Sequence, residues 1–152
     1  MDRRMDIIDL RKREDFINQY VQLRNAYAEL LLTSPVNVSE TREWLQKNDI
    51  EIRSLVENDI LLGVVILYLN KEGEISFFVK ESSKGIGSRL LNIIEEVAKK
   101  KNLKSIWAWV LEENLIAQKA FEKNRFKKES VSWKEYKGIV RKGIQYKKYL
   151  SY

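Results

Sequence analysis

A glycine-containing segment holds the residues of this sequence whose types and spacing most directly suggest chemistry. Lys84, Gly85, Ile86, Gly87 and Ser88 lie between an alternating apolar stretch and a helical run of apolar residues. The first N–H groups of a helix lack partners within the helix, and the helix dipole adds positive potential there. Because glycine lets a backbone approach a ligand closely, the segment predicts a phosphate-binding helix start, with a charge from Lys84 and a hydroxyl from Ser88.

The spacing of this segment excludes two common phosphate motifs. The Gly-Lys-Ser/Thr sequence of a Walker loop is absent, and Leu90 stands where the dinucleotide fingerprint has its third glycine. A helix start that is merely eased by glycine and binds nothing is the alternative interpretation.

The residue types that are missing limit the chemistry further. The 152 residues include no histidine and no cysteine, which excludes Ser-His-Asp hydrolases, thiolate nucleophiles and histidine-rich zinc sites. Acid–base chemistry must therefore use Asp, Glu, Lys, Tyr, a chain terminus or water. The composition, 44% hydrophobic and 33% charged, predicts one globular domain spanning residues 1–152.

Charge is distributed unevenly along the chain. Residues 1–98 carry 13 Lys and Arg against 17 Asp and Glu, whereas residues 99–152 carry 15 against 5. A basic half attracts nucleic acid, an anionic membrane face or a phosphorylated cofactor, and a solvated lysine-rich surface is the alternative. The longest apolar run, 60–69, is too short for a membrane span, and no signal peptide is evident, so we expect a cytoplasmic location.

The elements that position these residues follow from hydrophobic periodicity. A helix is predicted over 13–31, and a short one follows an N-cap at Ser39 and runs through Leu45. Gly138 and Gly143 are expected to bracket the link between the last two strands. The remaining predictions are strands over 51–57, 60–69, 74–80, 105–111, 126–134 and 143–150, a helix that follows the loop 81–88 and ends at 99–101, and a helix over 114–124. This order predicts an α+β (mixed α/β) fold with one central sheet, in which 60–69 is covered on both faces.

A second motif, which begins at Asn114, continues through Ala117 and Phe121 to Phe126. Together with the glycine loop it resembles the GNAT superfamily of acetyl-CoA-dependent N-acetyltransferases. The loop of that family reads Arg/Gln-x-x-Gly-x-Gly/Ala, and its later segment reads Asn-x-x-Ala-x-x-x-Tyr-x-x-x-Gly-Phe. The two motifs stand at the family's separation, and the resemblance covers residues 60–150. It implies a central, mostly antiparallel, splayed sheet flanked by about four helices.

The resemblance also implies roles for individual residues. Backbone amides of Lys84 to Ser88 would hold the pyrophosphate of coenzyme A, and strand 77–79, with Phe78 and Val79, would pair with the pantetheine arm. The N–H of Val79 would stabilise the thioester oxygen. Asn114 would hydrogen-bond the pantetheine. The same resemblance implies that Ala117 and Phe121 line the other wall, and that Lys119 and Lys123 meet the 3′-phosphate.

Three positions depart from the family pattern. Ser82 replaces the first Arg or Gln of the loop, and Arg125 replaces the late glycine. Phe121 replaces the tyrosine that in many members protonates the leaving thiolate. Water, or one of Tyr68, Tyr136 and Tyr146, would have to supply that proton.

Glu74, near the start of the fourth strand, is the expected general base, and a solvated carboxylate is its alternative interpretation. On the first helix, Arg24, Asn25 and Glu29 are expected to contact the acceptor. The resemblance therefore implies direct attack of a small-molecule amine, such as an amino sugar or a polyamine, on acetyl-CoA, in a monomer or homodimer without metal, nucleic acid or membrane. The alternatives are a catalytically impaired acyl-CoA-binding module, a protein N-terminal or lysine acetyltransferase, and a nucleic-acid-binding domain.

Overall fold

The sheet of this protein has seven strands. The computed structural model describes residues 5–80 and 85–151. The spatial order of the strands is β1 (Asp6–Ile8), β2 (Ile50–Glu57), β3 (Ile60–Tyr68), β4 (Glu74–Val79), β5 (Ser105–Leu111), β7 (Ile139–Tyr149) and β6 (Lys127–Tyr136). Neighbouring strands are antiparallel except β4 and β5, which run parallel. The predicted α+β fold with a mostly antiparallel central sheet is confirmed.

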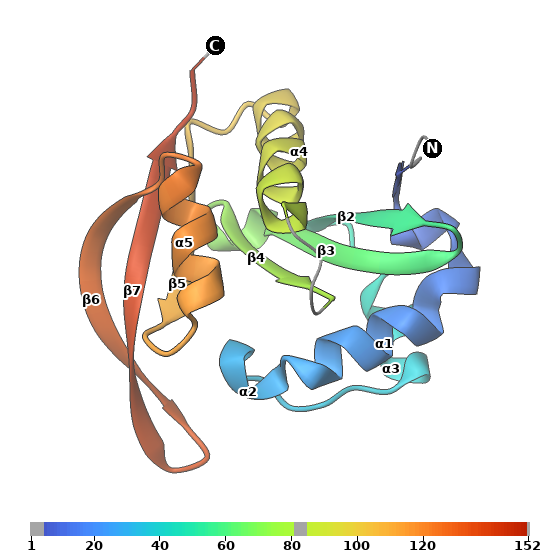
Figure 1. Ribbon diagram of the computed structural model, residues 1–152, viewed down its shortest axis with the longest axis horizontal. Helices are drawn as coiled ribbons and strands as arrows, with labels where there is room; N and C mark the ends of the chain where they lie inside the picture. Colours follow the sequence, from blue (N-terminus) through green and yellow to red (C-terminus); the bar gives the residue numbers. More distant parts are fainter. Residues whose placement is uncertain (1–4, 81–84, 152) are drawn as a thin grey trace.

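Five α-helices within the described residues cover the two faces of this sheet (Figure 1). One face carries α4 (Ile86–Lys100) and α5 (Leu115–Lys123). The other carries α1 (Ile17–Ala26), α2 (Ala28–Leu31) and α3 (Val38–Trp44). The continuous helix predicted over 13–31 is instead divided, because 3-10 turns at 10–12 and 14–16 precede α1 and a break at Tyr27 separates α1 from α2.

The apolar strand β3 explains why helices lie on both faces. Its side chains alternate between two buried clusters, with Val65 and Leu67 packed toward α4, and Val64 and Ile66 packed toward α1. Each fully buried Val, Leu or Ile contributes roughly 1.5–3 kcal/mol relative to exposure. The prediction that 60–69 is covered on both faces is confirmed. Because β4 pairs with β3, the buried strand β3 fixes the position of β4.

The N-cap of α3 is Asn37 and not Ser39. The Oδ1 of Asn37 accepts from the N–H of Glu40 at 2.8 Å, and the Glu40 carboxylate accepts from the N–H of Asn37 at 3.1 Å. This reciprocal capping box satisfies two donors at once, so the helix begins earlier than the position of Ser39 suggested.

Gly143 lies inside β7, which corrects its predicted place in the link before the last strand. The turn between β6 and β7 is the dipeptide Lys137-Gly138, with both residues at positive φ. A Cβ on Gly143 would lie 2.1 Å from Cζ2 of Trp109. Glycine is therefore required at position 143, because the indole of Trp109 occupies the space that a side chain would need. The last two strands are longer than predicted.

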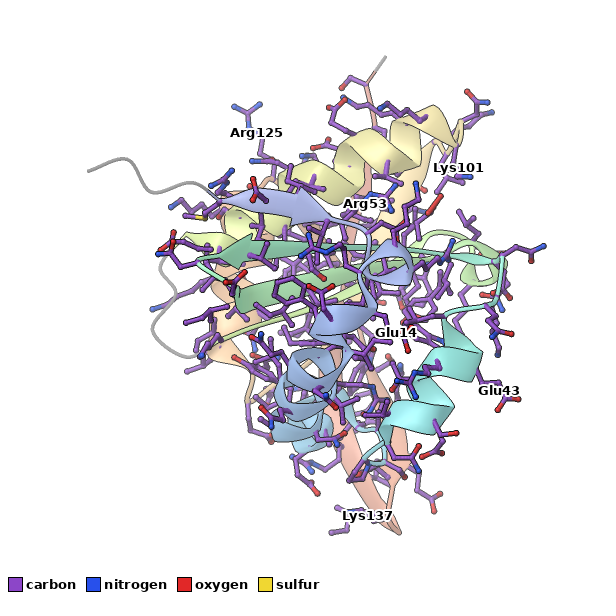
Figure 2. All side chains as sticks on the ribbon, turned by 90° about the vertical axis from the view of Figure 1, so that its right-hand side faces the viewer. Glu14, Glu43, Arg53, Lys101, Arg125 and Lys137 are labelled. Carbon is purple, nitrogen blue, oxygen red and sulfur yellow. The ribbon has the colours of Figure 1, made fainter. Side chains whose placement is uncertain are left out.

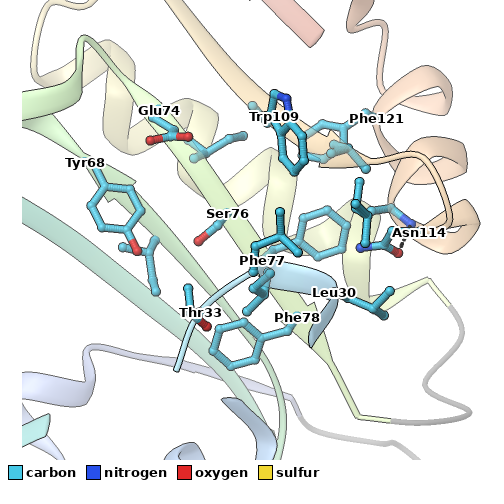
Figure 3. A pocket seen from close by; sticks show the side chains of 18 of the residues that line it. Leu30, Thr33, Tyr68, Glu74, Ser76, Phe77, Phe78, Trp109, Asn114 and Phe121 are labelled. Atoms are coloured by element: carbon cyan, nitrogen blue, oxygen red, sulfur yellow. Dashed lines mark hydrogen bonds between the residues drawn. The ribbon is translucent and has the colours of Figure 1, made fainter. Parts of the chain in front are cut away.

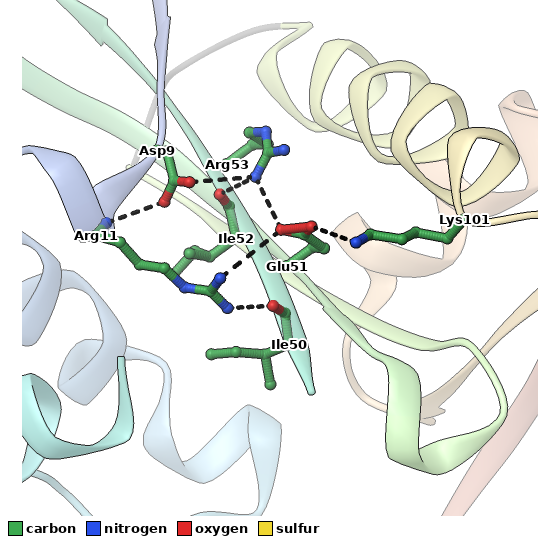
Figure 4. Close-up of polar contacts among 7 residues, drawn as sticks. All are labelled: Asp9, Arg11, Ile50, Glu51, Ile52, Arg53 and Lys101. Atoms are coloured by element: carbon green, nitrogen blue, oxygen red, sulfur yellow. Dashed lines mark hydrogen bonds and ion pairs between the residues drawn. The ribbon is translucent and has the colours of Figure 1, made fainter. Parts of the chain in front are cut away.

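The N-terminal segment is attached to β2 through charged side chains (Figure 4). The carboxylate of Glu51 meets Lys101 at 3.3 Å, Arg53 at 3.4 Å and Arg11 at 4.0 Å, and Arg53 also approaches Asp9 at 3.8 Å. Glu51 is only 14% exposed, so this carboxylate joins the start of the chain, β2 and the end of α4.

Other charged side chains project away from the sheet. Glu43, Arg125 and Lys137 extend from the periphery in Figure 2, and all three are exposed. Within 5–80 and 85–151, no helix has the length and apolarity needed to cross a membrane.

Candidate active site

Strands β4 and β5 separate soon after they meet. Glu74 and Trp107 are the one pair of described residues in register between them, and the N–H of Trp107 donates to the carbonyl of Gly73 at 3.1 Å. Beyond this bridge β5 continues against β7 while β4 continues against β3. The splay that the family resemblance implied is confirmed.

The splay leaves one edge of β4 without a strand. In an antiparallel pair, hydrogen-bonded positions alternate along the strand. The N–H of Lys80 donates to the carbonyl of Leu62 at 2.7 Å, so every second residue before it, including Phe78, directs its main chain toward β3. The N–H and carbonyl groups of Phe77 and Val79 therefore point toward the splay. Val79 has the orientation expected of it, and Phe78 does not.

Phe78 contributes its side chain instead. Its ring packs against Tyr20 and Tyr27, with centroids 5.8 and 6.2 Å away, and it borders the cavity described next. The correction for Phe78 follows from the two-residue period of a strand, because its main chain pairs with Val64.

A cavity of about 290 Å³ occupies the splay (Figure 3). One wall is the face of β4 that carries Glu74 and Ser76, with Tyr68 beside them. The opposite wall combines Trp109 with the start of α5. The remaining lining residues come from α1, α2 and the residues that follow it, η3 (Leu69–Lys71), β5, α5 with its N-cap, and β6. They include Arg24, Leu30, Leu31, Leu32, Thr33, Lys71, Asn114, Ala117, Phe121 and Lys134.

The start of α4 lies near the far end of β4. Gly85 has a φ of 78°, and a Cβ built on it would meet no atom of the described residues within 4 Å. The first bond of the helix runs from Arg89 N–H to the Gly85 carbonyl, and no described side chain caps this end. The amides of 86–88 therefore have no partner within the helix. Lys84 and Ser82 lie outside the described residues.

The predicted loop residues Ile86, Gly87 and Ser88 differ in the chemical groups that they could offer to a ligand. Ile86 is buried, so it offers its main chain alone. A Cβ on Gly87 would lie 3.1 Å from Cε2 of Phe77, which shows how closely the first turn packs on β4. The Ser88 hydroxyl accepts from Nδ2 of Asn124 at 3.0 Å and thereby ties α4 to the end of α5.

Helix α5 and its N-cap border the cavity. Asn114 accepts from the N–H of Ala117 at 3.2 Å and so caps the helix, and both residues border the cavity. The buried ring of Phe121 lies edge-on to Phe77 at 5.3 Å and stacks on Tyr146 at 5.6 Å. Lys123 is exposed in the last turn of α5 and is not part of the cavity wall; Lys119 is also exposed.

Three tyrosines are candidates to replace the missing phenol at Phe121. The hydroxyl of Tyr146 donates to Glu122 at 2.7 Å, and that of Tyr136 donates to the carbonyl of Thr33 at 2.7 Å. Tyr68 is the one of the three that borders the cavity. Burial raises the pKa of Tyr68, a hydrogen bond with Ser76 opposes this, and the charge of Glu74 adds to it. Tyr68 therefore remains a protonated donor at neutral pH.

Of the three residues predicted on the first helix, Arg24 borders the cavity. Asn25 is engaged elsewhere, since its amide donates to the carbonyl of Val36 at 2.8 Å and accepts from the same residue's N–H at 2.9 Å. Glu29 is exposed and meets Lys137 at 3.1 Å.

Sequence reasoning missed several lining residues. Lys134 lies over the ring of Trp109 at 4.5 Å, and Lys71 lies over that of Tyr68 at 5.0 Å. Burial lowers the pKa of Lys134, with Glu74 opposing and Lys71 adding to the effect. No local pattern marks the two lysines, because they reach the cavity from separate elements. The one signal in the sequence is Trp109 itself, an aromatic side chain over which a cation can pack.

Known proteins resemble this chain in sequence and in structure. The family model described as acetyltransferase (GNAT) family matches residues 17–126. A search of curated proteins gives no match. Among residues 5–80 and 85–151, no group of three or more acidic side chains is arranged to hold a metal ion.

Many solved structures share the fold. An N-acetyltransferase from Staphylococcus aureus Mu50 superposes with a TM-score of 0.82 at 20% identity, covering 97% of this chain and 99% of the other. Salmonella typhimurium yncA, solved with its cofactor acetyl-CoA, gives 0.82 at 14%, covering 97% and 94%. Spermidine N-acetyltransferase from Vibrio cholerae, in complex with CoA and spermine, gives 0.81 at 17%, covering 95% of each chain.

Proposed function

The chain belongs to the acetyltransferase (GNAT) family, and from this premise we propose that it moves an acetyl group from acetyl-CoA to the primary amine of a small molecule by direct attack. The observation that carries the proposal is the splay between β4 and β5. It joins an unpaired strand edge at Phe77 and Val79 to a cavity that holds Glu74. Donor and acceptor then meet in one enclosed space, which removes much of the entropic cost of a bimolecular reaction.

The start of α4 is the site proposed for the donor's phosphates. Among the described residues no atom fills the space beside Gly85, and the amides of 86–88 have no partner within the helix. Both features fit an anion, since the amides and the dipole favour negative charge. The pantetheine arm then follows the free edge of β4 between the amides of Phe77 and Val79 and the wall of Asn114, Ala117 and Phe121.

The same edge stabilises the charge that develops on the thioester oxygen. The N–H of Val79 or Phe77 donates to that oxygen, and because this donor is fixed in the strand it needs no reorganisation during attack. Such a backbone donor serves the same purpose whether or not a side chain assists it.

Glu74 is proposed as the general base. It shares the cavity wall with Ser76 and Tyr68, so a water held among these groups relays the amine proton to the carboxylate. Phe121 has no proton to give, and we assign protonation of the departing thiolate to water, or to Tyr68 through water.

Lys123 remains a prediction as a contact for the 3′-phosphate. Asn25 and Glu29 are assigned structural contacts in place of acceptor contacts.

One observation favours a second candidate function. A phenyl ring stands at Phe121 and the hydroxyl of the adjacent Tyr146 is bonded to Glu122, which fits an acyl-CoA-binding module that has lost catalysis. Such a module would bind acetyl-CoA and release no thiol with any acceptor. Protein N-termini and lysines remain the alternative acceptor class.

Calorimetric titration with acetyl-CoA, followed by thiol release across a panel of amines, tests the proposal. Binding with acceptor-dependent release supports the transferase. Binding without release on small amines or on peptides with free N-termini and lysines supports the module, and no binding contradicts both. Cell fractionation and light scattering would test the cytoplasmic location and the monomeric or dimeric state that remain predictions.

A further inference from the structure

A second cavity adjoins the first and shares two of its residues. It measures about 230 Å³ and is lined by Tyr20, Arg24, Val36, Glu40, Thr41, Trp44 and Tyr68. Arg24 and Tyr68 border both cavities. The charge of Arg24 also opposes the burial that raises the pKa of Tyr20, which lines the second cavity. Arg24 therefore stands at the junction of the space that holds Glu74 and the space between α1 and α3.

The charges around this junction are mostly positive. Arg24, Lys71 and Lys134 border the first cavity together with the carboxylate of Glu74, and the second cavity adds the carboxylate of Glu40, which accepts from the N–H of Asn37. Across the part of the chain that the structure describes, none of the three cations lies within 4.0 Å of a carboxylate. Arg24 donates to the carbonyl of Ser34 at 2.9 Å, and the two lysines lie over aromatic rings. Arg24 is half-buried and the two lysines are exposed at the rim, and a group of cations without carboxylate partners favours an anion.

The distance along β4 separates these cations from the proposed phosphate site. Glu74 and Val79 lie at opposite ends of the strand, and five steps of strand span about 17 Å. The charges of Lys71 and Glu74 both act on Lys134, so the two lysines lie at the end of β4 that carries Glu74. Helix α4 begins beyond the other end, at Val79. The cations thus belong to the acceptor half of the cavity and not to the phosphate half.

An unpartnered hydroxyl lies on the same wall. The Oγ1 of Thr33 is buried and has no hydrogen-bond partner among the described residues, and Thr33 borders the first cavity. It directly precedes Ser34, whose carbonyl holds Arg24. A buried polar atom without a partner is unfavourable, so a bound acceptor that engages this hydroxyl would bind more tightly.

We propose that the acceptor is a primary amine that also carries a carboxylate or phosphate group, and that Arg24 binds this anion while the amine faces Glu74. The inference rests on the proposed acetyl transfer and names its substrate class. Lys71 and Lys134 add to the positive field, and the aromatic side chains of Tyr20, Trp44 and Tyr68 leave room for the rest of the molecule. A polyamine is disfavoured, because its second ammonium would lie among three cations.

The experiment compares matched amines that differ in charge. Glucosamine is paired with glucosamine 6-phosphate, propylamine with β-alanine, and ethanolamine with phosphoethanolamine, with spermidine as the cationic probe. Binding is measured first, in the presence of CoA, by the fluorescence of Trp44 and Trp109, and kcat/KM is then measured by thiol release. A charge-assisted hydrogen bond contributes about 1.5–3 kcal/mol, so the anionic member of at least one pair should be preferred by about 10- to 100-fold. Phosphate and carboxylate pairs distinguish the two sources of the anion.

Arg24→Gln should abolish this preference and leave the affinity for acetyl-CoA within about twofold. Arg42→Gln is the matched control, because Arg42 is exposed and pairs with Glu14 outside both cavities. Lys134→Gln, which should reduce the preference in part, serves if Arg24→Gln does not fold. Preference for neutral amines or spermidine, no binding of any anionic amine, or an equal loss for all amines in Arg24→Gln, would overturn the inference. Arg24-dependent binding without thiol release would support it while contradicting the proposed transfer.

Discussion

Glu74 and Trp107 form the last bridge between β4 and β5. This bridge fixes where the sheet opens, and it places the proposed base at the apex of the opening. Beyond the bridge β5 stays paired with β7, over seven residue pairs in all, and β4 stays paired with β3, so the two strands part. The fold therefore supplies an unpaired strand edge without leaving it exposed to a neighbouring molecule, since side chains from both sides line the gap.

Gly85→Val tests the proposed phosphate site. The new side chain would occupy the open space at the start of α4, and we expect the Kd for acetyl-CoA, measured by calorimetry, to rise about tenfold or more as the contacts at the unpaired amides are lost. Gly138→Val is the matched control, because Gly138 also has positive φ and open surroundings but lies in the β6–β7 turn. Equal affinities for acetyl-CoA in the two variants would contradict the assignment.

Gly143→Ala tests the position of Trp109. Its Cβ would overlap the indole, so the ring must leave the cavity wall, and overpacking of this kind costs about 1–3 kcal/mol of unfolding free energy. We expect a shift in tryptophan emission and a higher KM for the acceptor. Ser132→Ala, which removes only the hydrogen bond from the indole N–H at 3.0 Å, should change both much less. An unchanged emission spectrum in Gly143→Ala would show that the ring is not held as described.

Phe121→Tyr restores the phenol that many members of the family carry. The position is buried and borders the cavity beside Phe77. If protonation of the thiolate limits turnover, kcat should rise by about tenfold, below the 10²–10⁴ that a well-placed general acid contributes. The affinity for acetyl-CoA should stay constant, as measured by calorimetry. A kcat equal to that of the wild type would mean that water already supplies this proton fast enough.

The charge of Lys134 predicts a pH dependence. Partial desolvation lowers its pKa, so it loses its proton at a lower pH than a fully solvated lysine, and the cavity becomes less positive as pH rises through that value. Affinity for an anionic probe without an amine, such as succinate followed by tryptophan fluorescence, should therefore fall with rising pH in the alkaline range. Lys134→Gln should flatten this alkaline dependence. A dependence of equal size in the variant would assign the titration to another group.

The glycine loop and the Asn114 motif could be predicted from sequence because each acts through local rules. A helix start with unpaired amides and an asparagine that caps the next helix need no distant residue to define them. The orientation of the Val79 main chain follows from the alternation of groups along a strand. The same alternation corrects the prediction for Phe78, whose main chain faces β3. Here the register was the missing information.

The acceptor half of the site could not be predicted in this way. Arg24, Lys71 and Lys134 come from α1, η3 and β6, and their approach depends on how the β6–β7 hairpin reaches α2 through Tyr136 and Thr33. Asn25 and Glu29 have the polar character expected of ligands, but tertiary contacts with Val36 and Lys137 engage them. The residue types along one helix do not show which of its polar side chains will be engaged by contacts from other parts of the chain.

The most direct test of the account is the rate of acetyl transfer in Glu74→Gln. The substitution keeps size and hydrogen bonding while removing the basic carboxylate, and general base catalysis contributes about 10²–10⁴-fold. With the best amine found, kcat/KM should fall about 100-fold or more at neutral pH and recover partly at higher pH, as more of the amine is already deprotonated. The Kd for acetyl-CoA should be unchanged. A rate within about threefold of wild type across this pH range, with donor binding intact, would contradict the assignment of Glu74 at the apex of the splay as the base.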